Sequence, residues 1–447
     1  DNPLNGEGAV AAPAAPGAAA APAQGGELSY SEMLDKFLSE AAATEAAKKA
    51  AKKKHEFLVK SLNMPPTKYT ASGLPATSAD VLRKLAGEPF TDPPEYGLAF
   101  KHFQERGGDG KAACEAIYAL HSMSSIDTML SNFIEPLRTL ADEKSRVHCS
   151  MNINTETGRL SARRPNLQNQ PALEKDQYRI RSAFSAEEGN QLIVADYGQL
   201  ELRLLAHITD CRSMIDAFAS GGCFHSRTAV GMFPHVRKAV DDGEVLLEWD
   251  YSKGEPPAPL LKDYYGSERR KAKTLNFSIA YGKTVHGLSK DWNVSVDEAK
   301  EILDAWYADR PEVLDWQKKV KAEARRTGYT RTLMGRYRAL PGISVPKLRG
   351  HGERAAINTP IQGGAADIVV LAMIKLQRSE LLKNLGYKLL LQVHDEVILE
   401  GPEEQVDEAL AEVRRCMEAP WDDFGLKPLK VELTVDAKFA KTWYEAK

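Results

Sequence analysis

Two short acidic motifs follow apolar runs that are typical of β-strands. Residues 191–196 (QLIVAD) end on Asp196, and the run at 387–393 (YKLLLQV) leads directly into the tripeptide HDE. A further apolar run at 397–399 follows, so the second motif is predicted at the tip of a tight hairpin. A single Asp in a turn is usually turn chemistry. Two acids on strands of one sheet would instead repel each other unless a cation neutralised them.

These acids indicate a metal site that acts on phosphorus. Asp196 and Asp395 provide hard oxygen ligands without neighbouring thiolates or several histidines, which favours magnesium or a similar ion over zinc. Two such ions about 3.5–4 Å apart stabilise in-line displacement at phosphorus. We therefore expect the two side chains to meet if both strands join one sheet.

Residues 268–284 (ERRKAKTLNFSIAYGKT) predict a helix with two different faces. At about 100° per residue, Arg269, Phe277 and Tyr281 lie within about 80° of Lys273. The opposite side carries three apolar residues: Ala272, Leu275 and Ile279. A purely structural helix would not readily place two rings on its polar stripe. Two cations followed by two rings suit a polyphosphate joined to a sugar or base.

Positive charge is concentrated in other segments as well, although the formal net charge is −3. Six Lys and Arg residues lie in 158–181 against two acids, and five Arg residues lie in 325–338 without an acid. Polar side chains able to reach base edges or phosphates accompany them: Asn166, Gln168 and, four apart on one predicted helix face, Arg354, Asn358 and Gln362. Each segment alone could be an ordinary surface, but together they suit phosphate positioning and minor-groove reading.

Length and composition limit the class of protein. The chain has 447 residues, 43% of them hydrophobic and 27% charged, a globular balance that predicts two or three packed units. A net charge of −3 excludes histone-like binding of polyanions through bulk charge. The five cysteines never form a C-x-x-C pair, which argues against a disulfide framework and a structural zinc. No apolar run is expected to span a bilayer.

The elements that must position these residues indicate an α+β class. Residues 1–26 are predicted to be a flexible Ala/Pro-rich leader. Helical patterns follow at 30–62, after Ser78 and around 117–134, so the N-terminal third is expected to be helical. The three strand candidates lie between helix-rich pieces. An acidic stretch at 240–266 carries no recognisable motif.

Three motifs resemble the polymerase motifs of family A DNA polymerases. They are DYGQLELR at 196–203, the pattern R-x-x-x-K-x-x-x-F-x-x-x-Y-G at 269–282, and QVHDE at 392–396. They occur in the family's order, with TGRLS and NLQN upstream and RAAINTPIQG between the last two. The resemblance covers about residues 60–447. The stretches SARRPNLQNQPALEKD and SSIDTMLSNFI are most similar to the plant and algal organellar branch.

The resemblance implies a right-hand architecture with an antiparallel-sheet palm, helical fingers and a helical thumb. The thumb is expected at 27–145, the palm at 146–205 and 340–447, and the fingers at 206–339. No D-x-E pair precedes Asp196, so we expect no proofreading exonuclease in this piece. Gly198 stands where Ser is common in the family, which is expected to loosen the adjacent turn slightly.

The resemblance also implies roles for single residues. Asp196 and Asp395 would hold two Mg²⁺ ions, which Mn²⁺ can replace, with the Tyr197 carbonyl as a further ligand and Glu396 as a nearby catalytic acid. Lys273 would also protonate the leaving pyrophosphate, and Glu201 would fill the space that a ribose 2′-hydroxyl needs. The residues expected to bind the incoming dNTP are Arg269, Lys273, Phe277, Tyr281, Glu201, His225 and Gln199. Those expected to bind DNA are Arg159, Asn166, Gln168, Arg354, Asn358, Gln362, Gln392 and His394.

The activity that the resemblance implies is template-directed addition of dNTPs to a primer 3′-hydroxyl, serving replication or repair of DNA in a plastid or mitochondrion. The implied partners are primer–template DNA and dNTPs, with a monomeric enzyme, other replisome proteins and no membrane. Two alternatives are a single-subunit RNA polymerase and a catalytically inactive DNA-binding homologue. Glu201 argues against the first. Intact Asp196, Asp395, Lys273 and Arg269 argue against the second.

Overall fold

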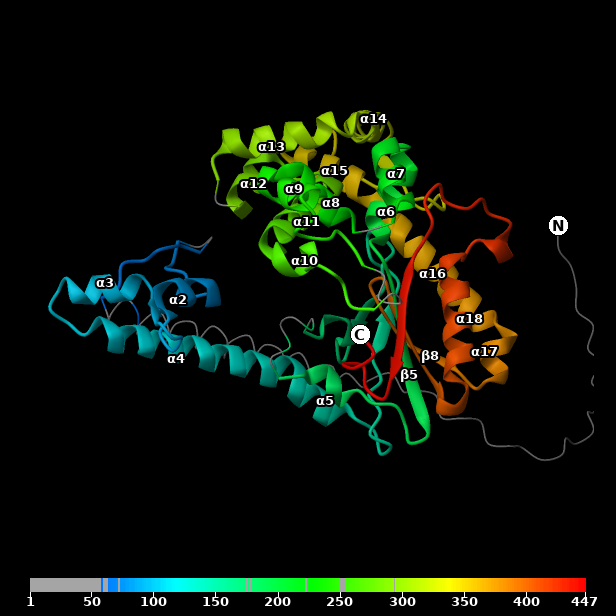
Figure 1. Cartoon of the computed structure of the whole chain (residues 1–447), viewed down its shortest axis with the longest axis horizontal. Coiled ribbons are helices and arrows are strands. Elements are labelled where there is room, and N and C mark those ends of the chain that lie inside the picture. The colour runs from blue at the N-terminus through cyan, green and yellow to red at the C-terminus, as the bar shows by residue number, and fades with distance from the viewer. Residues whose placement is uncertain are drawn as a thin grey trace, which may run out of the picture. The chain divides into compact units, whose positions relative to one another are not determined.

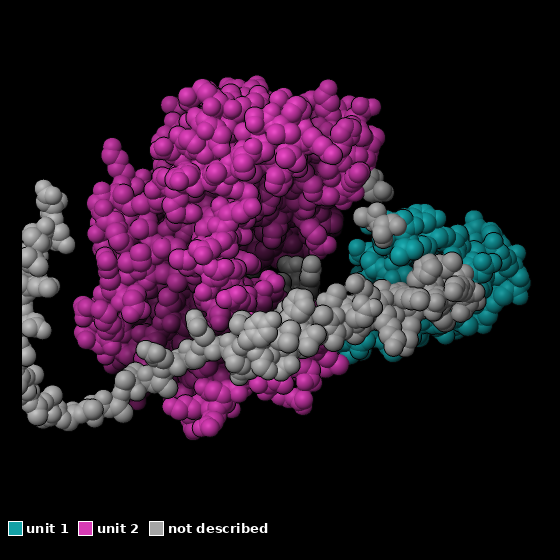
Figure 2. Space-filling model, turned by 180° about the vertical axis from the view of Figure 1, so that it is seen from behind, with its two compact units in different colours: residues 1–129 teal, residues 130–447 magenta. Residues whose placement is uncertain are grey.

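The computed structural model describes residues 58, 63–70, 73–171, 173, 176, 178–221, 223–249, 254–292 and 294–447. The chain divides into two compact units, Asp1–Met129 and Leu130–Lys447, which are coloured separately in Figure 2. The predicted leader and, apart from Leu58, the helix expected at 30–62 lie outside the described residues.

The described part of the first unit is helical, as expected. Its elements are α2 (Ala79–Ala86), β1 (Gly87–Glu88), β2 (Glu95–Tyr96), α3 (Leu98–Gln104) and α4 (Gly110–Met129). Ser78 is the N-cap residue of α2, as predicted, although its side chain makes no capping hydrogen bond. The core joins Leu82 and Leu85 of α2 to Ile117 of α4. Towards the end of α4, Ile126 is 43% exposed and lies outside this core.

A four-stranded antiparallel sheet organises the second unit. Its order is β10-β5-β9-β8, formed by β5 (Asn190–Tyr197), β8 (Lys388–Val393), β9 (Glu396–Pro402) and β10 (Val435–Ala440). The three strands predicted from apolar runs are confirmed, whereas β10 was not predicted. Helices and an antiparallel sheet together confirm the α+β class.

The two faces of the sheet bury different residues because side chains alternate along a strand. Ile193, Ala195 and Tyr197 of β5 pack in one core with residues of four helices: α6 (Leu200–Thr209), α16 (Gly364–Arg378), α17 (Glu380–Asn384) and α18 (Val406–Glu418). Figure 1 shows α16 and α18 beside β5 and β8. Leu192 and Val194 point to the other face, where they pack with Trp443. Asp196 continues this second series.

The remaining elements of the second unit surround this sheet. Those preceding β5 are η2 (Leu130–Ile134), α5 (Glu135–Leu140), β3 (Ser150–Asn152), β4 (Ser161–Arg163), η3 (Leu167–Asn169) and η5 (Ile180–Ala183). Those between α6 and the second half of the sheet are α7 (Arg212–Ala219), α8 (Phe224–Met232), α9 (Pro234–Asp241), α10 (Leu261–Tyr264), α11 (Gly266–Ala280), α12 (Val285–Trp292), α13 (Val296–Ala308), α14 (Pro311–Thr327), β6 (Tyr329–Arg331), β7 (Tyr337–Ala339), α15 (Pro346–Asn358) and η7 (Thr359–Gly363). After α16 come α17 (Glu380–Asn384), η8 (Glu403–Gln405) and η9 (Asp422–Phe424).

One helical run crosses the second unit from α15 through η7 to α16. Within the described residues this run, Pro346–Arg378, is long and apolar enough to span a membrane, with a mean hydropathy of 1.3 over its best window. The expectation that no apolar run in the sequence could span a bilayer is therefore wrong by this measure of length and hydropathy. However, 67% of that window is buried inside the protein, as expected for a core helix.

Candidate active site

The sheet brings the two predicted metal ligands together. In the register of β5 and β9, Asp196 lies opposite Glu396. His394 and Asp395 form the turn between β8 and β9, with His394 in the left-handed region at φ 59°. The Tyr197 N–H donates to the Asp395 carbonyl at 3.1 Å, so the end of β5 lies directly beside the hairpin tip. Both strands thus join one sheet, which was the condition for the two acids to meet.

Burial and mutual repulsion make these two acids difficult to ionise. Burial, and then the charge of Asp196, raise the pKa of Asp395 to about 7. Burial also raises the pKa of Asp196, as do Glu396 and the Asp436 carboxylate of the neighbouring strand β10. Of the polar atoms described, Oδ1 of Asp196 is among those that are buried without a hydrogen-bond partner. A hard divalent cation would relieve both conditions, so the donor set fits such an ion.

Glu396 is held by residues that the sequence motifs did not predict. It is 2% exposed, and its Oε1 accepts a hydrogen bond from Trp443 Nε1 at 2.8 Å. Its Oε2 contacts the Lys447 ammonium, which also lies 3.3 Å from Asp196 Oδ2. Neither Trp443 nor Lys447 belongs to an apolar or basic pattern in the sequence. In the described part of the chain, no three Asp, Glu, His or Cys side chains form a metal-binding cluster.

Helix α11 has the two faces predicted for residues 268–284. Ala272, Leu275 and Ile279 are buried, whereas Lys273 is exposed. The rings of Phe277 and Tyr281 stack with centroids 6.0 Å apart and an interplanar angle of 24°. The polar stripe therefore presents a cation at its middle and a pair of stacked rings at its C-terminal end.

Arg269 and His225 lie next to this stripe. Arg269 Nη2 is 3.1 Å from Cys223 Sγ, and its Nε is buried and unpaired among the described atoms. Burial, followed by the charges of Arg269 and Lys273, lowers the pKa of His225 to about 3. Nδ1 of His225 accepts from the Asn276 amide at 3.1 Å, so the neutral ring carries its proton on Nε2. The opposite orientation of that amide is excluded because Asn276 Oδ1 accepts from Trp306 Nε1 at 3.0 Å.

Glu201 connects the sheet region to the end of α11. Its buried carboxylate accepts from Arg159 Nη2 and from the Tyr281 hydroxyl, each at 2.5 Å. Burial, followed by the Glu201 charge, raises the pKa of Tyr281. Arg159, which binds the same carboxylate, also lines a hollow together with His394, the residue before Asp395. The aromatic end of α11 and the two acids therefore belong to one site.

The turn after β5 is fixed by backbone and side-chain contacts. Gln199 has φ 56°, and its Oε1 accepts from the Phe224 N–H at the start of α8 at 3.1 Å. The Gly198 N–H donates to the Thr434 carbonyl at 2.8 Å. A Cβ on Gly198 would lie 2.7 Å from Thr434 Oγ1. Glycine thus allows this close approach, and a looser turn at Gly198 stays a prediction.

Comparison with known proteins identifies the family. Residues 29–244 and 259–445 match the sequence profile of DNA polymerase family A. The chain belongs to DNA polymerase family A. The unmatched residues 245–258 lie inside the acidic stretch noted in the sequence. Family A DNA polymerases depend on metal ions.

The relatives of this family A polymerase chain are organellar and bacterial. It is 53% identical to DNA polymerase I A, chloroplastic/mitochondrial, of Arabidopsis thaliana over 420 residues, which cover 85% of this chain and 40% of the relative. It is 35% identical to the thermostable DNA polymerase I of Thermus aquaticus, over 83% of this chain and 43% of the relative. The chain thus spans about two fifths of the length of these relatives. The POL domain of Pol1 from M. smegmatis, in complex with DNA primer–template and dNTP, superposes with a TM-score of 0.66 at 30% identity, over 93% of this chain and 66% of that one.

Several residues that were expected to contact DNA gather around the hairpin tip. Arg159, Gln392 and His394 line one small hollow. Gln392 donates to the His394 carbonyl, and Gln168 Nε2 donates to the Gln392 carbonyl at 3.0 Å. Gln168 is buried, so its place suits support of Gln392. Exposed Asn166 accepts from the Gln168 N–H at 3.1 Å and caps η3.

The expected helix carrying Arg354, Asn358 and Gln362 is not a continuous α-helix. Arg354 and Asn358 lie in α15, but Gln362 lies in the π-turn η7. A π-turn changes the angle between successive residues, so spacing by four no longer places all three on one face. Arg354 is exposed, whereas Asn358 and Gln362 are half-buried.

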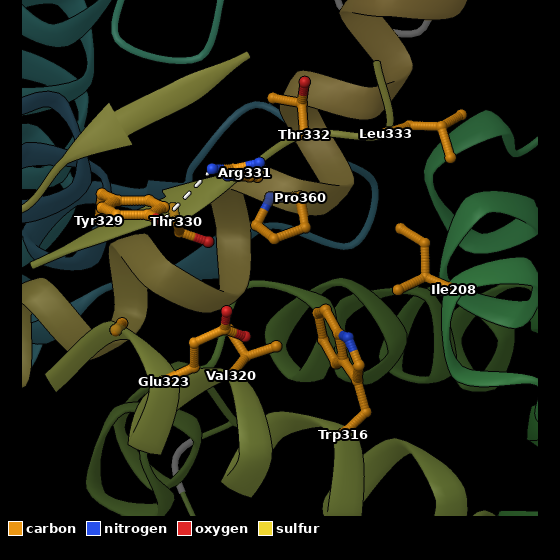
Figure 3. A pocket seen from close by; sticks show the side chains of 11 residues that line it. Ile208, Trp316, Val320, Glu323, Tyr329, Thr330, Arg331, Thr332, Leu333 and Pro360 are labelled. Atoms are coloured by element: carbon orange, nitrogen blue, oxygen red, sulfur yellow. Dashed lines mark hydrogen bonds between the residues drawn. The ribbon is translucent and has the colours of Figure 1, made fainter. Parts of the chain in front are cut away.

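A cavity of about 370 Å³ lies away from these acids, between α14, β6 and η7. Figure 3 shows Trp316 and Val320 rising from α14 towards Pro360 and Ile208. None of its lining residues is a predicted site residue. The chemistry indicated by the sequence is therefore placed at the acids and α11, not in this cavity.

Proposed function

We propose that this chain catalyses template-directed addition of deoxynucleotides to a primer 3′-hydroxyl, with release of pyrophosphate. The observation that carries the proposal is the meeting of Asp196 and Asp395 where β5 and the β8–β9 hairpin end, with Glu201 linking Tyr281 at the end of α11 to Arg159 beside the hairpin tip. A pair of hard acids and a helix bearing cations and rings are the two parts that nucleotidyl transfer requires.

The proposed cofactor is a pair of Mg²⁺ ions. Asp196 and Asp395 would hold them through carboxylate oxygens, and the backbone carbonyl of Tyr197 would complete the donor set. When bound, the ions lower the pKa of the primer 3′-hydroxyl and neutralise charge on the phosphates. The unpaired Asp196 Oδ1 and the raised pKa of both acids support this assignment.

The face of α11 would bind the incoming dNTP. Arg269 and Lys273 would contact the triphosphate, and Lys273 would protonate the departing pyrophosphate. The neutral His225 ring would donate Nε2–H to a phosphate oxygen. Phe277 would stack on the sugar, with Tyr281 at the position of the templating base.

Glu201 and its partners would set the sugar specificity and the shape of the site. Glu201, fixed between Arg159 and Tyr281, would occupy the space that a ribose 2′-hydroxyl needs. Gln199 would act by fixing the start of α8, where His225 lies. Gln392 and His394, with Arg159, would contact the primer–template minor groove, and Arg354, Asn358 and Gln362 would contact the DNA backbone and bases.

The chain would be divided as the resemblance implies, with a thumb at 27–145, a palm at 146–205 and 340–447, and fingers at 206–339. The names of the Arabidopsis relatives support a place in chloroplasts or mitochondria. We propose that the enzyme acts as a monomer on primer–template DNA, together with other replication proteins.

Replacing Asp395 tests the proposal. Asp395→Ala should reduce primer extension by about a thousandfold or more, because one metal ligand is lost. Primer–template affinity should stay within about threefold of wild type, since DNA contacts are made by other residues. The matched control is Asp407→Ala, which removes an exposed carboxylate from α18.

Single-nucleotide extension and filter binding on the same preparations give the answer. Turnover of Asp395→Ala within tenfold of wild type would exclude the metal role. Extension with NTPs in place of dNTPs would favour an RNA polymerase, and DNA binding without extension by the wild-type chain would favour an inactive homologue.

A further inference from the structure

The last residues of the chain form a fixed turn against the sheet face that carries Asp196. The Trp443 N–H donates to the Phe184 carbonyl at 2.9 Å, and the Ala446 N–H donates to the Thr442 carbonyl at 3.1 Å. The Trp443 side chain is 1% exposed and packs edge-on against Phe184, with ring centroids 5.3 Å apart. The Arg181 guanidinium lies 4.2 Å from the centre of the Trp443 ring. Trp443 and Ala446 are thus buried against the sheet immediately before Lys447.

This turn directs the Lys447 ammonium between two acids. Nζ contacts Oε2 of Glu396 and lies 3.3 Å from Oδ2 of Asp196. Glu396 is buried, and the Lys447 and Asp196 side chains are about one-third exposed. The ammonium therefore acts at short range in a partly desolvated setting, where its interaction is stronger than on an open surface.

The two oxygens of the Asp196 carboxylate have different surroundings. Oδ2 faces the ammonium, while Oδ1 is buried without a hydrogen-bond partner in the described part of the chain. A divalent ion bound at Oδ1 would lie close to the positively charged Lys447 ammonium beside Oδ2. The two cations repel each other, so the site cannot bind both at full strength.

We propose that Lys447 is a positioning residue that sets the metal affinity of the site. Without metal, its ammonium stabilises the carboxylates of Asp196 and Glu396. When a divalent ion binds, the ammonium withdraws from Asp196. The inference rests on the proposed function, because it takes Asp196 to be a metal ligand. It explains how the partly buried Asp196 and the buried Glu396 are accommodated in the folded chain before metal is bound. It also predicts an affinity kept below the maximum that the oxygens could give.

Direct measurement of Mn²⁺ binding tests the role of Lys447 without relying on turnover. Mn²⁺ is titrated into the full chain in the absence of DNA and nucleotide, and free ion is followed by electron paramagnetic resonance. Lys447→Gln should bind Mn²⁺ about fivefold or more tightly, because one nearby positive charge is removed. Lys447→Arg retains the charge and should bind like wild type. Lys441→Gln is the matched control, since its ammonium donates to the backbone carbonyls of Glu187 and Asn190.

A second measurement covers destabilised variants. Without metal, Lys447→Gln should melt at a lower temperature than wild type, because Glu396 loses its cationic partner. Mn²⁺ should raise its melting temperature more than that of wild type. A merely structural lysine would lower the melting temperature equally with and without Mn²⁺.

The outcomes separate the inference from the proposed function. Equal or weaker Mn²⁺ binding by Lys447→Gln, with binding lost in Asp395→Ala, overturns the role of Lys447 alone. Unchanged Mn²⁺ binding in Asp395→Ala overturns the metal site itself. Tighter binding by both Lys447→Gln and Lys441→Gln would reduce the effect to bulk charge and also overturn the inference.

Discussion

His225 shows how contacts fix the protonation state of one side chain that we propose to bind the dNTP. Its ring is 3% exposed, and two cations of α11 act on it. The Asn276 amide accepts from Trp306 and donates to Nδ1, which leaves the proton on Nε2. A neutral ring with its proton on Nε2 can donate to a phosphate while adding no further charge beside Arg269 and Lys273. The position of the proton on the His225 ring therefore depends on tertiary contacts.

The same burial predicts an acid-sensitive stability. The pKa of His225 is 6.5 as a free group and about 3 in the folded chain, so between these values the unfolded chain binds more protons. Lowering the pH through this window therefore favours unfolding. From about pH 8 to about pH 5, the wild type should lose about 2 kcal/mol more free energy of unfolding than His225→Gln.

Urea denaturation of both proteins at the two pH values measures this difference. The comparison at the higher pH removes the cost of the lost Asn276 contact, since the ring is neutral there in both states. Wild-type and variant stabilities that fall in parallel would show that His225 is not held neutral by burial.

The sequence predicted the acids better than their partners. Asp196 and Asp395 could be located because apolar strand runs end beside them, and alternation along a strand determines which face each side chain takes. Trp443 and Lys447 could not, because their contacts with Glu396 depend on how the last turn packs against the sheet. Nothing in the local composition around them specifies that packing.

At the scale of elements, α11 and the run from α15 to α16 differ in how much the sequence reveals. The faces of α11 follow from a regular angle per residue, so its buried and polar sides were predicted correctly. The π-turn η7 interrupts this regularity. It carries Pro360 and Gly363 within an otherwise helical pattern, and the Arg336 guanidinium donates to the Gly363 carbonyl at 3.0 Å. Its geometry depends on contacts with distant segments.

Two adjacent glycines test how tightly η7 is packed. A Cβ on Gly363 would lie 2.6 Å from Thr332 Cγ2 and 3.0 Å from the Thr157 carbonyl oxygen. Gly363→Ala should therefore lower the free energy of unfolding by about 1–3 kcal/mol. A Cβ on Gly364 would lie 3.5 Å from its nearest neighbour, in ordinary contact. Gly364→Ala should be neutral or more stable by up to about 1 kcal/mol.

Melting temperatures of the two variants, measured side by side, give the comparison. Equal stability of Gly363→Ala and Gly364→Ala would mean that η7 relaxes freely. In that case the close approach to Thr332 and Thr157 would not constrain the turn.

At the scale of the whole molecule, the positions of the charged residues matter more than the net charge. The net charge of −3 gives no general attraction to DNA. Three arginines of the basic segment 325–338 form ion pairs within the protein. The pairs are Arg325–Glu353, Arg336–Asp367 and Arg338–Glu156. The sequence showed only the concentration of arginines. Which of them remain open to phosphate depends on partners far along the chain.

Binding of primer–template DNA should still weaken steeply with salt. Each phosphate that the protein neutralises releases counterions, so several contacts give a slope of about −3 or steeper in log affinity against log salt. Arg354 is exposed on α15 and was predicted to contact DNA, so Arg354→Ala should reduce the magnitude of the slope by about 1. Arg378→Ala removes an exposed arginine at the end of α16 and should leave the slope unchanged. Fluorescence anisotropy over a series of KCl concentrations measures all three slopes. A flat wild-type response would contradict a phosphate-binding surface, and equal slopes for the three proteins would remove Arg354 from it.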